Sequence, residues 1–443
     1  MKRFVLRRLA TILYTTGLVG MSSQVMASAF QLWEQDGASI GNYHAGYAAL
    51  AEDASTAFYN PAGIIRIQNK QVVAGADAIM SSFKYRGTIA VNGLGGLPMP
   101  VTAQGGTFSV VPFLHYVAPI TEKIGFGFSV DAPFGLKTNY GSSTTLRYAA
   151  TLSSLTVIDI SPSLGFLVSE KGSLGIGLDL QRVIAEFDDV ATLLTPANNT
   201  TSQTKATGTA FGYHFGGLYQ FSENTRLGLS YHSQMVHHLT GSSKFIGPLN
   251  ALTGGPLETS RAKANVTLPP YTALSAFHQI NSQFAIMGSV IYTQWNTFKN
   301  LIINNVAGLV PGGPPPFGLA PSGNIQVTIP AHYRNTWNLS LGGNYYPTDK
   351  VIIRAGIGFD ETPVLTGTRN VQIPDNNRYV IALGGHYQAT KIVGVDLGWT
   401  HFFIGQSRIN PPPQVTGAQV VVTNGHVTGG ADVFGGQIVL DVA

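Results

Sequence analysis

Most of this chain is a series of short segments in which apolar and polar residues alternate. In the segment from Ile124 to Asp131 the even-numbered residues are large and apolar, and the odd-numbered residues are glycine, serine and aspartate. The same alternation recurs in segments 174–181, 211–221 and 351–360. Because successive side chains of a β-strand point to opposite faces, each segment is predicted to be a strand with one apolar face. Soluble β-sandwiches alternate too, so this pattern alone does not say what the apolar face contacts.

The connectors between the segments indicate their surroundings. We count about fourteen segments between Gln71 and Val442, joined in strict turn by connectors of about three residues and of about a dozen or more. The short connectors fall near residues 120–122, 170–172, 222–224, 281, 347–350 and 389–391. The long connectors run over about residues 87–106, 136–154, 189–205, 241–261, 300–324, 363–375 and 408–428. All short connectors therefore lie at one end of the sheet. This arrangement is typical of outer-membrane proteins, and it predicts an all-β fold, an antiparallel transmembrane β-barrel of about fourteen strands over residues 70–443.

Residues 1–27 have the three parts of a secretory signal peptide. A basic start is followed by an apolar stretch from Leu9 to Val19 and by a small-residue cleavage site that ends at Ala27, so the mature chain is expected to begin at Ser28. All four basic residues of this segment would be removed, which lowers the Lys and Arg total from 26 to 22, equal to the 22 Asp and Glu. The basic isoelectric point of the full chain therefore gives no support to nucleic-acid binding.

The composition agrees with a membrane barrel. Only 11% of the residues are charged, cysteine is absent, and glycine numbers 52. A low charge content suits strands that face lipid on one side, and a barrel closed by backbone hydrogen bonds has no need of disulfides. We expect one barrel, monomeric, in the outer membrane of a Gram-negative bacterium, with outer membrane lipids around it.

The N-terminal segment 28–69 does not alternate. Residues 41–53 are small and are expected to form a short helix, and Asn60-Pro61-Ala62 predicts the start of a second helix that runs to about Gln68, because Asn is favoured at the N-cap and Pro at the first helical position. This segment either packs on the outside or plugs the lumen as a hatch. A barrel of about fourteen strands is too wide for its own side chains to fill, which favours the hatch.

Several spaced motifs resemble the FadL/TodX (OMPP1) family of outer membrane transporters. They are Ser28–Leu32, Ala51–Ser55, Asn60–Ala62, Asp131–Thr138, Gly358–Val364 and Ile373–Arg378. The resemblance covers essentially the whole mature chain. It implies a fourteen-stranded barrel, a hatch that carries the Asn-Pro-Ala motif, and uptake of long-chain fatty acids or other hydrophobic compounds by diffusion.

Two predicted external loops carry apolar residues, which is unusual for loops exposed to water. These residues are Leu193, Leu194, Phe245, Ile246, Leu249 and Leu252. They either pack the two loops together or form a capture groove for a hydrophobic ligand. The family resemblance implies the groove.

A fatty acid also needs a partner for its carboxylate, and a lumen cation is the natural choice. Arg334 shares the polar phase of Thr336, which predicts that it faces the lumen, and the resemblance places a carboxylate-binding Lys of the family at this position. The alternative for Arg334 is an ion pair with a hatch acid such as Glu52. Arg182 lies near a second basic position of the family, although its phase follows the apolar Leu180.

The third predicted strand is interrupted at Pro133, Phe134 and Gly135. Proline cannot donate to a strand ladder, and glycine often marks a bend, so the strand either ends here or kinks. The resemblance implies an inward kink that opens the wall for lateral exit of substrate. It also places Phe30 near the substrate pocket, where movement of the N-terminal segment would release a tightly held ligand.

Other classes of function have less support in the sequence. No spacing of Ser and His singles out a catalytic triad, so no enzyme activity is expected. His232, His237 and His238 have no acidic or Cys partner at ligand spacing, so we expect ordinary histidines at the mouth of a loop, no metal and no cofactor. The functions that remain are a channel for long-chain fatty acids, a channel for aromatic or alkane hydrocarbons, and a structural or adhesive surface barrel.

Overall fold

The computed structural model describes residues 29–253, 257–313 and 318–442. The predicted signal peptide and Ser28 lie outside these residues. The strands of the barrel are β1 Lys70–Val91, β3 Phe108–Thr121, β4 Ile124–Asp131, β5 Gly135–Asn139, β6 Leu152–Ser169, β7 Gly172–Leu193, β8 Thr195–Ser222, β9 Thr225–His232, β10 Met235–Ile246, β11 Leu257–Leu268, β12 Tyr271–Gln279, β13 Phe284–Thr293, β14 Asn300–Pro311, β15 Leu319–Pro330, β16 Thr336–Thr348, β17 Val351–Asp360, β18 Arg378–Gln388, β19 Val393–Ile409 and β21 Gln419–Val442. Two short strands, β2 Met99–Gln104 and β20 Gln414–Thr416, pair with β1 and β21.

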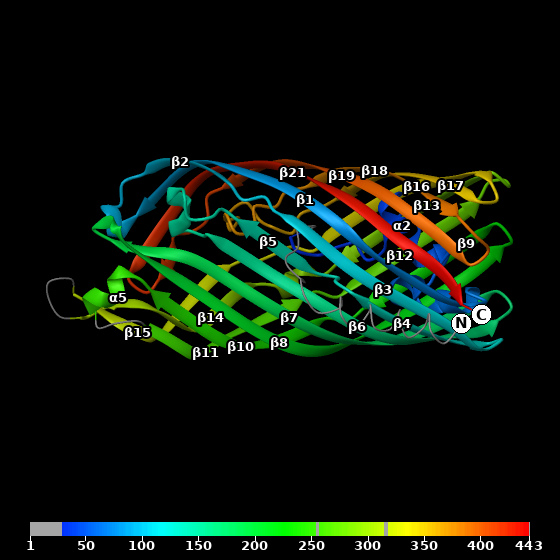
Figure 1. The fold of residues 1–443 in the computed structure, drawn as a ribbon, viewed down its shortest axis with the longest axis horizontal. Helices are drawn as coiled ribbons and strands as arrows, with labels where there is room; N and C mark the ends of the chain where they lie inside the picture. The colour runs from blue at the N-terminus through cyan, green and yellow to red at the C-terminus, as the bar shows by residue number, and fades with distance from the viewer. Residues whose placement is uncertain (1–28, 254–256, 314–317, 443) are drawn as a thin grey trace, which may run out of the picture.

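The barrel is closed by its first and last strands. β1 and β21 pair antiparallel from Lys70 opposite Val442 to Val91 opposite Val421, and all the other neighbours also pair antiparallel (Figure 1). Five wall strands are interrupted, so that β4 and β5, β9 and β10, β11 and β12, β13 and β14, and β15 and β16 each form one strand in two parts. The wall therefore has fourteen strands, which confirms the predicted fold class.

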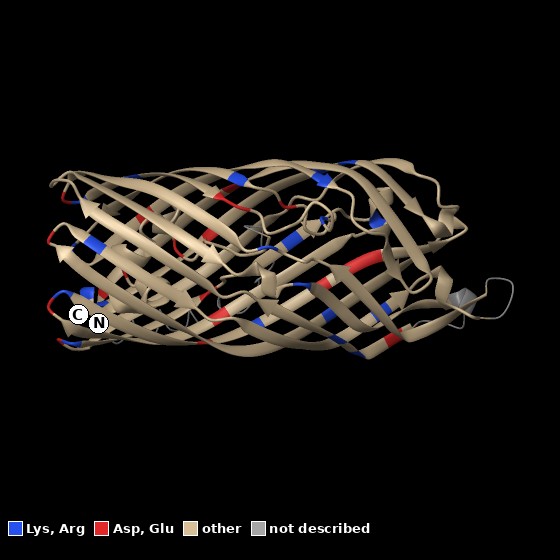
Figure 2. Ribbon diagram, turned by 180° about the vertical axis from the view of Figure 1, so that it is seen from behind, with Lys and Arg blue, Asp and Glu red and all other residues tan. Residues whose placement is uncertain are grey.

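The alternation of the sequence matches the two faces of the wall. Leu174, Leu178 and Phe211 belong to the exposed apolar face, whereas Gly175 and Asp179 are buried on the lumen side. Charged residues are sparse along the wall and several mark the turns at the end that carries the C-terminus (Figure 2). Among the described residues, no helix is both long and apolar enough to cross a membrane.

Several of the predicted long loops differ from expectation, among them 408–428, which contains β20 and the start of β21. Residues 189–205 mostly extend β7 and β8, and the chain turns at Leu194, which has a positive φ of 67°. The regions 241–261 and 300–324 likewise contain long parts of β10, β11, β14 and β15. The sequence did not show these extensions because strands beyond the membrane can be polar on both faces, and alternation then disappears while backbone pairing continues.

The N-terminal segment packs against the inside of the wall. It contains α2 Gly37–Ile40, α3 Tyr47–Leu50, α4 Thr56–Tyr59 and the 3₁₀ helix η1 Pro61–Arg66. These helices contact strands from around the barrel, since α2 meets β18, β19 and β21, α3 meets β9 and β12, and η1 meets β6, β7 and β8. We call residues 29–69 the hatch.

The Asn-Pro-Ala motif begins a helix as predicted. The Asn60 side chain accepts a hydrogen bond from the Ala62 amide at 3.1 Å, and Pro61 occupies the first turn. The helix is a 3₁₀ helix that ends at Arg66 and not an α-helix to Gln68. Two paired wall glycines make room for the motif, because a Cβ on Gly216 would lie 1.9 Å from the Asn60 Oδ1 and one on Gly175 would lie 2.3 Å from the Ala62 amide.

Candidate functional site

An apolar pocket lies in the lumen above the hatch. Its walls come from strands far apart in the sequence and from the hatch, and they include Phe30, Leu136, Phe187, Val266, Leu301 and Tyr333. Its few polar side chains are the neutral Thr368, Asn370 and Gln372. The pocket is therefore suited to an apolar ligand with at most a small polar end.

Phe30 is the hatch residue that forms part of this pocket. Its ring packs edge-on against Trp295 at 4.7 Å and Phe298 at 5.4 Å between ring centroids, and it lies 6.3 Å from Phe134. Such edge-to-face contacts add stability beyond the burial of apolar area. The Ala29 amide donates to the Asp375 carboxylate at 2.9 Å, which fixes the start of the same segment.

The third wall strand is interrupted where the sequence predicted. β4 ends at Asp131 and β5 begins at Gly135. β5 pairs with β6, but within the described residues it has no ladder with β3 on its other side. The N-terminal arm pairs with the start of this strand in place of β3, because Gln31 forms an isolated antiparallel bridge with Phe134.

An external groove lies between the extended hairpins, at the end of the barrel away from the chain termini. Leu193, Phe245 and Leu249 line this groove together with residues of β14 and β20. Leu194 and Ile246 are 64% and 52% exposed and do not line it.

Leu252 belongs to the short helix α5 Pro248–Thr253, and its side chain lies outside the described part of the chain. Of the predicted apolar residues, Leu193, Phe245 and Leu249 therefore line the groove, because their side chains point into it.

A third, smaller space lies between the groove and the lumen pocket and shares lining residues with both. With the groove it shares Asp189, Ser202 and Thr416. With the lumen pocket it shares Phe187, Ile329 and Gln372. The three spaces form a series from the external end of the barrel to Phe30.

Comparison with known proteins identifies the family. A family model described as outer membrane protein transport protein (OMPP1/FadL/TodX) matches residues 18–441. The chain belongs to this family. It is an outer membrane protein with the barrel typical of such transporters in Gram-negative bacteria.

Curated relatives and solved structures agree with this assignment. The chain is 26% identical over 424 residues to the long-chain fatty acid transport protein of Salmonella typhi, covering 89% of this chain and 91% of that protein. It is 26% identical over 430 residues to outer membrane protein P1 of Haemophilus influenzae, with 88% and 89% covered. The structure of a Pseudomonas aeruginosa FadL homologue has a TM-score of 0.81 at 24% identity, covering 93% of this chain and 99% of that one. The Pseudomonas putida toluene transporter TodX has a TM-score of 0.67 at 16% identity, with 94% and 100% covered.

The prediction that Arg334 faces the lumen is wrong. In this FadL/TodX barrel the Arg334 side chain is 47% exposed, pairs with Glu361 at 3.2 Å and does not line the lumen pocket. The alternation of β16 does place Thr336 inside, but residues 331–335 lie outside any strand, so the period of two does not extend back to Arg334. Arg182 is exposed on the same face as Leu180, as its phase indicated, and it also does not line the pocket.

Arg369 is a buried cation next to the pocket that the sequence analysis missed. It is 5% exposed, and its Nη2 donates to the carbonyl oxygen of Val364 at 3.0 Å. Val364 lines the lumen pocket, and the Arg369 Nε has no hydrogen-bond partner among the described residues. No periodicity marks this residue, because it lies in an irregular loop between β17 and β18.

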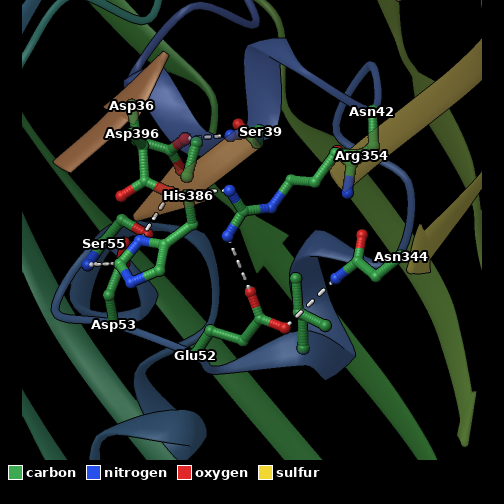
Figure 3. A network of polar contacts seen from close by, with 12 residues as sticks. Asp36, Ser39, Asn42, Glu52, Asp53, Ser55, Asn344, Arg354, His386 and Asp396 are labelled. Atoms are coloured by element: carbon green, nitrogen blue, oxygen red, sulfur yellow. Dashed lines mark hydrogen bonds and ion pairs between the residues drawn. The ribbon is translucent and has the colours of Figure 1, made fainter. Parts of the chain in front are cut away.

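A second buried cation, Arg354, holds the hatch to the wall (Figure 3). Arg354 on β17 is 4% exposed and pairs with Asp396 of β19 at 2.6 Å and with Glu52 of the hatch at 3.3 Å. His386 also contacts the Asp396 carboxylate, at 3.0 Å. The predicted alternative of an ion pair with a hatch acid therefore exists, but its cation is Arg354 and not Arg334. In the sequence, Arg354 occupies a lumen-facing position in the alternation of β17, and this position could have identified it as the cation.

The expectation of histidines at the mouth of a loop is wrong for His232 and His237, which are buried on β9 and β10. His232 is buried in the lumen, and its ring stacks on His214 with centroids 5.0 Å apart and planes 13° apart. The acidic partner that the sequence analysis did not find is Asp179, which lies 35 residues before His214 in the chain. The Oδ1 atom of Asp179 lies 2.7 Å from the Nδ1 atom of His214. A histidine nitrogen binds a metal in the plane of its ring, so two stacked parallel rings do not converge on one ion. This geometry favours a polar Asp179–His214 contact covered by His232.

Proposed function

We propose that this protein takes up long-chain fatty acids across the outer membrane by passive diffusion. The observation that carries the proposal is the row of three neighbouring spaces, with shared lining residues, from the external groove to the apolar pocket beside Phe30. Leu193, Phe245 and Leu249 would capture the acyl chain, which gains about 0.8 kcal/mol for each methylene group that leaves water. The similarity to a protein named long-chain fatty acid transport protein supports the same substrate class.

The substrate would leave sideways through the wall at the kink formed by Pro133, Phe134 and Gly135. The absence of a ladder between β5 and β3 supports this route. At the kink the backbone forms hydrogen bonds with the N-terminal arm and not with β3. Below the pocket the lumen is occupied by the hatch and holds charged groups, such as Glu52 of the hatch and the buried Arg354 of the wall. An apolar chain therefore has a lower free energy in the adjoining membrane than on an axial path.

Arg369 is the residue that would bind the carboxylate of a fatty acid. Its guanidinium is buried next to the pocket wall and carries a free Nε–H. Arginine binds carboxylates through charge-assisted hydrogen bonds, and these are stronger where water is excluded. Ligand entry would bring the carboxylate toward Thr368 and Asn370, which flank Arg369 and line the pocket.

Neutral hydrocarbons are the second candidate substrates, and one observation favours them. Within the described residues, no Lys or Arg side chain lines the groove, the middle space or the lumen pocket. The structural relative TodX is named a toluene transporter, although its 16% identity supports only the fold.

Uptake into liposomes that contain the purified barrel tests these functions. Saturable uptake of oleate, well above that of empty liposomes, is expected if fatty acids are the substrate. Uptake of toluene without oleate would favour the hydrocarbon channel. Uptake of neither would contradict transport and favour a structural or adhesive surface barrel.

A further inference from the structure

A row of basic side chains crosses the outer face of the wall where the barrel closes. β19, β21 and β1 lie side by side (Figure 1), and their register places Arg408 opposite His426 and His426 opposite Arg86. Directly opposite side chains on one face have Cβ atoms about 4.5–5.5 Å apart, so the three groups are neighbours. Lys84 precedes Arg86 on the same face of β1. We call these four residues the basic row.

The basic row points away from the lumen. The next residues along the three strands, Tyr85, Val427 and Ile409, are at most 1% exposed and belong to the apolar interior of the barrel. Because side chains alternate between the two faces of a strand, the basic residues beside them face outward. The Lys and Arg side chains are accordingly exposed, and the histidine is half-buried.

The basic row has no acidic counterpart on the protein. In the described part of the chain, none of its four side chains makes an ion pair or a hydrogen bond. Two other cations of the extended hairpins are each paired, Lys205 with Glu186 at 2.9 Å and Lys244 with Glu258 at 3.2 Å. Like charges that face one another across strands are destabilising. An anion bound between the basic side chains would remove this repulsion.

The basic row lies beyond the lipid-facing part of the wall. The apolar band of an outer-membrane barrel is about 25 Å tall and is edged by aromatic residues. From Lys70, β1 rises about 25 Å to the level of Asp432, at about 3.3 Å per residue and a tilt of about 40°. Asp432 there accepts a hydrogen bond from the Trp399 Nε1 at 3.0 Å. On the same basis Arg86 lies about 40 Å from Lys70, so the row is about 10–15 Å outside the apolar band.

The same three strands are apolar below the basic row. Met80, Phe403 and Phe434 are 44%, 51% and 46% exposed on the outer face. These side chains can contact acyl chains in the membrane. The whole face therefore fits an amphiphile that has acyl chains within the membrane and anionic groups about 10–15 Å above them.

We propose that the basic row binds the anionic core sugars of a lipopolysaccharide molecule in the outer leaflet. Lipopolysaccharide carries phosphate and carboxylate groups on the sugars just outside its acyl chains, which is the level of the row. Arginine binds such groups through charge-assisted hydrogen bonds, and basic clusters beside a membrane hold anionic lipid headgroups. The bound lipid covers the joint between β1 and β21, the strands that close the barrel. This inference does not depend on which substrate the barrel carries.

Binding of lipopolysaccharide to the purified barrel tests the proposal. The barrel is purified in nonionic detergent with EDTA, which removes lipopolysaccharide that copurifies. Its affinity for fluorescent rough lipopolysaccharide, which keeps the phosphorylated inner core, is measured by anisotropy. Arg86→Gln with Arg408→Gln is expected to weaken binding about 10- to 30-fold. Arg86→Lys with Arg408→Lys keeps both charges and should retain most of the affinity.

A second double variant makes the result specific. Lys205→Gln with Lys244→Gln removes the same charge from cations that are already paired with acids, and it should bind lipopolysaccharide within about twofold of wild type. Heat-dependent gel mobility checks that every barrel folds. No loss of affinity in Arg86→Gln with Arg408→Gln, or an equal loss in the two glutamine variants, would overturn the proposal. An equal loss of affinity for phosphatidylglycerol would also overturn it, because the row would then attract any anionic lipid.

Discussion

The backbone amide of Gly135 donates a hydrogen bond to the carbonyl oxygen of Phe30 at 2.7 Å. The Leu32 amide donates in turn to the Pro133 carbonyl at 2.9 Å, so the N-terminal arm completes the kinked strand as a short β-bridge. The Phe30 side chain meanwhile lines the lumen pocket. One short segment thus completes the interrupted strand and also lines the pocket, so a ligand that displaces Phe30 is expected to disturb the two hydrogen bonds at the kink.

Locking the arm to the kink is expected to stop transport. Gln31 and Phe134 are bridge partners flanked by the two hydrogen bonds, a pairing whose Cα atoms lie about 4.5 Å apart and which suits a disulfide. The chain has no cysteine, so only an introduced pair can oxidise. Gln31→Cys with Phe134→Cys should lose oleate uptake when oxidised and regain it on reduction, as measured in liposomes. Each single cysteine variant controls for the lost side chain, and full uptake by the oxidised pair would show that the arm need not move.

The external groove offers a matched pair of neighbouring residues. Phe245 is buried in the groove, whereas Ile246 is 52% exposed and points away from it. Phe245→Asp is expected to lower oleate capture about 10- to 100-fold, since losing one buried apolar contact removes about 1.5–3 kcal/mol. Ile246→Asp should transport like wild type. Heat-dependent gel mobility checks that both barrels fold, and equal loss in the two variants would exclude a specific groove.

Variants of Arg369 and Arg334 test whether the buried or the exposed arginine binds the carboxylate of the substrate. Arg369→Gln is expected to weaken palmitate binding about 10- to 100-fold, because a charge-assisted hydrogen bond contributes about 1.5–3 kcal/mol. Binding of hexadecane, which has no carboxylate, should not change. Arg334→Gln is the control and should bind both ligands normally. Displacement of a fluorescent probe measures all four affinities, and a parallel loss of palmitate and hexadecane in Arg369→Gln would mean that the residue only supports the pocket.

The Arg354 contacts predict how firmly the hatch is held. Arg354→Gln leaves the Asp396 and Glu52 carboxylates without their cation, which costs about 3–5 kcal/mol for a buried pair. The hatch should then loosen, with faster hydrogen exchange in segment 47–66 and measurable ion conductance through the barrel. Lys350→Gln, at an exposed turn, is the comparison. Unchanged exchange in Arg354→Gln would show that apolar packing alone holds the hatch.

The sequence predicted the local features of the fold well. The alternation around Ile124 to Asp131 and the break at Pro133 both appear in the structure, because side-chain phase and the missing proline N–H act within a few residues. The same reasoning failed for Arg334, since residues 331–335 leave the strand and the phase is lost. It also failed to find Arg369, which lies in an irregular loop and is buried only by distant parts of the chain.

The pattern of residues along the chain was enough to predict an outer membrane barrel, its number of strands and the apolar face of each strand. These properties follow from a period of two and from connector lengths, and both are written along the chain. Two contacts appear only in the folded barrel: Glu52 pairs with Arg354, and Phe30 completes the pocket. Each of these depends on barrel closure and on where the hatch lies inside it, which join residues hundreds of positions apart and leave no local pattern.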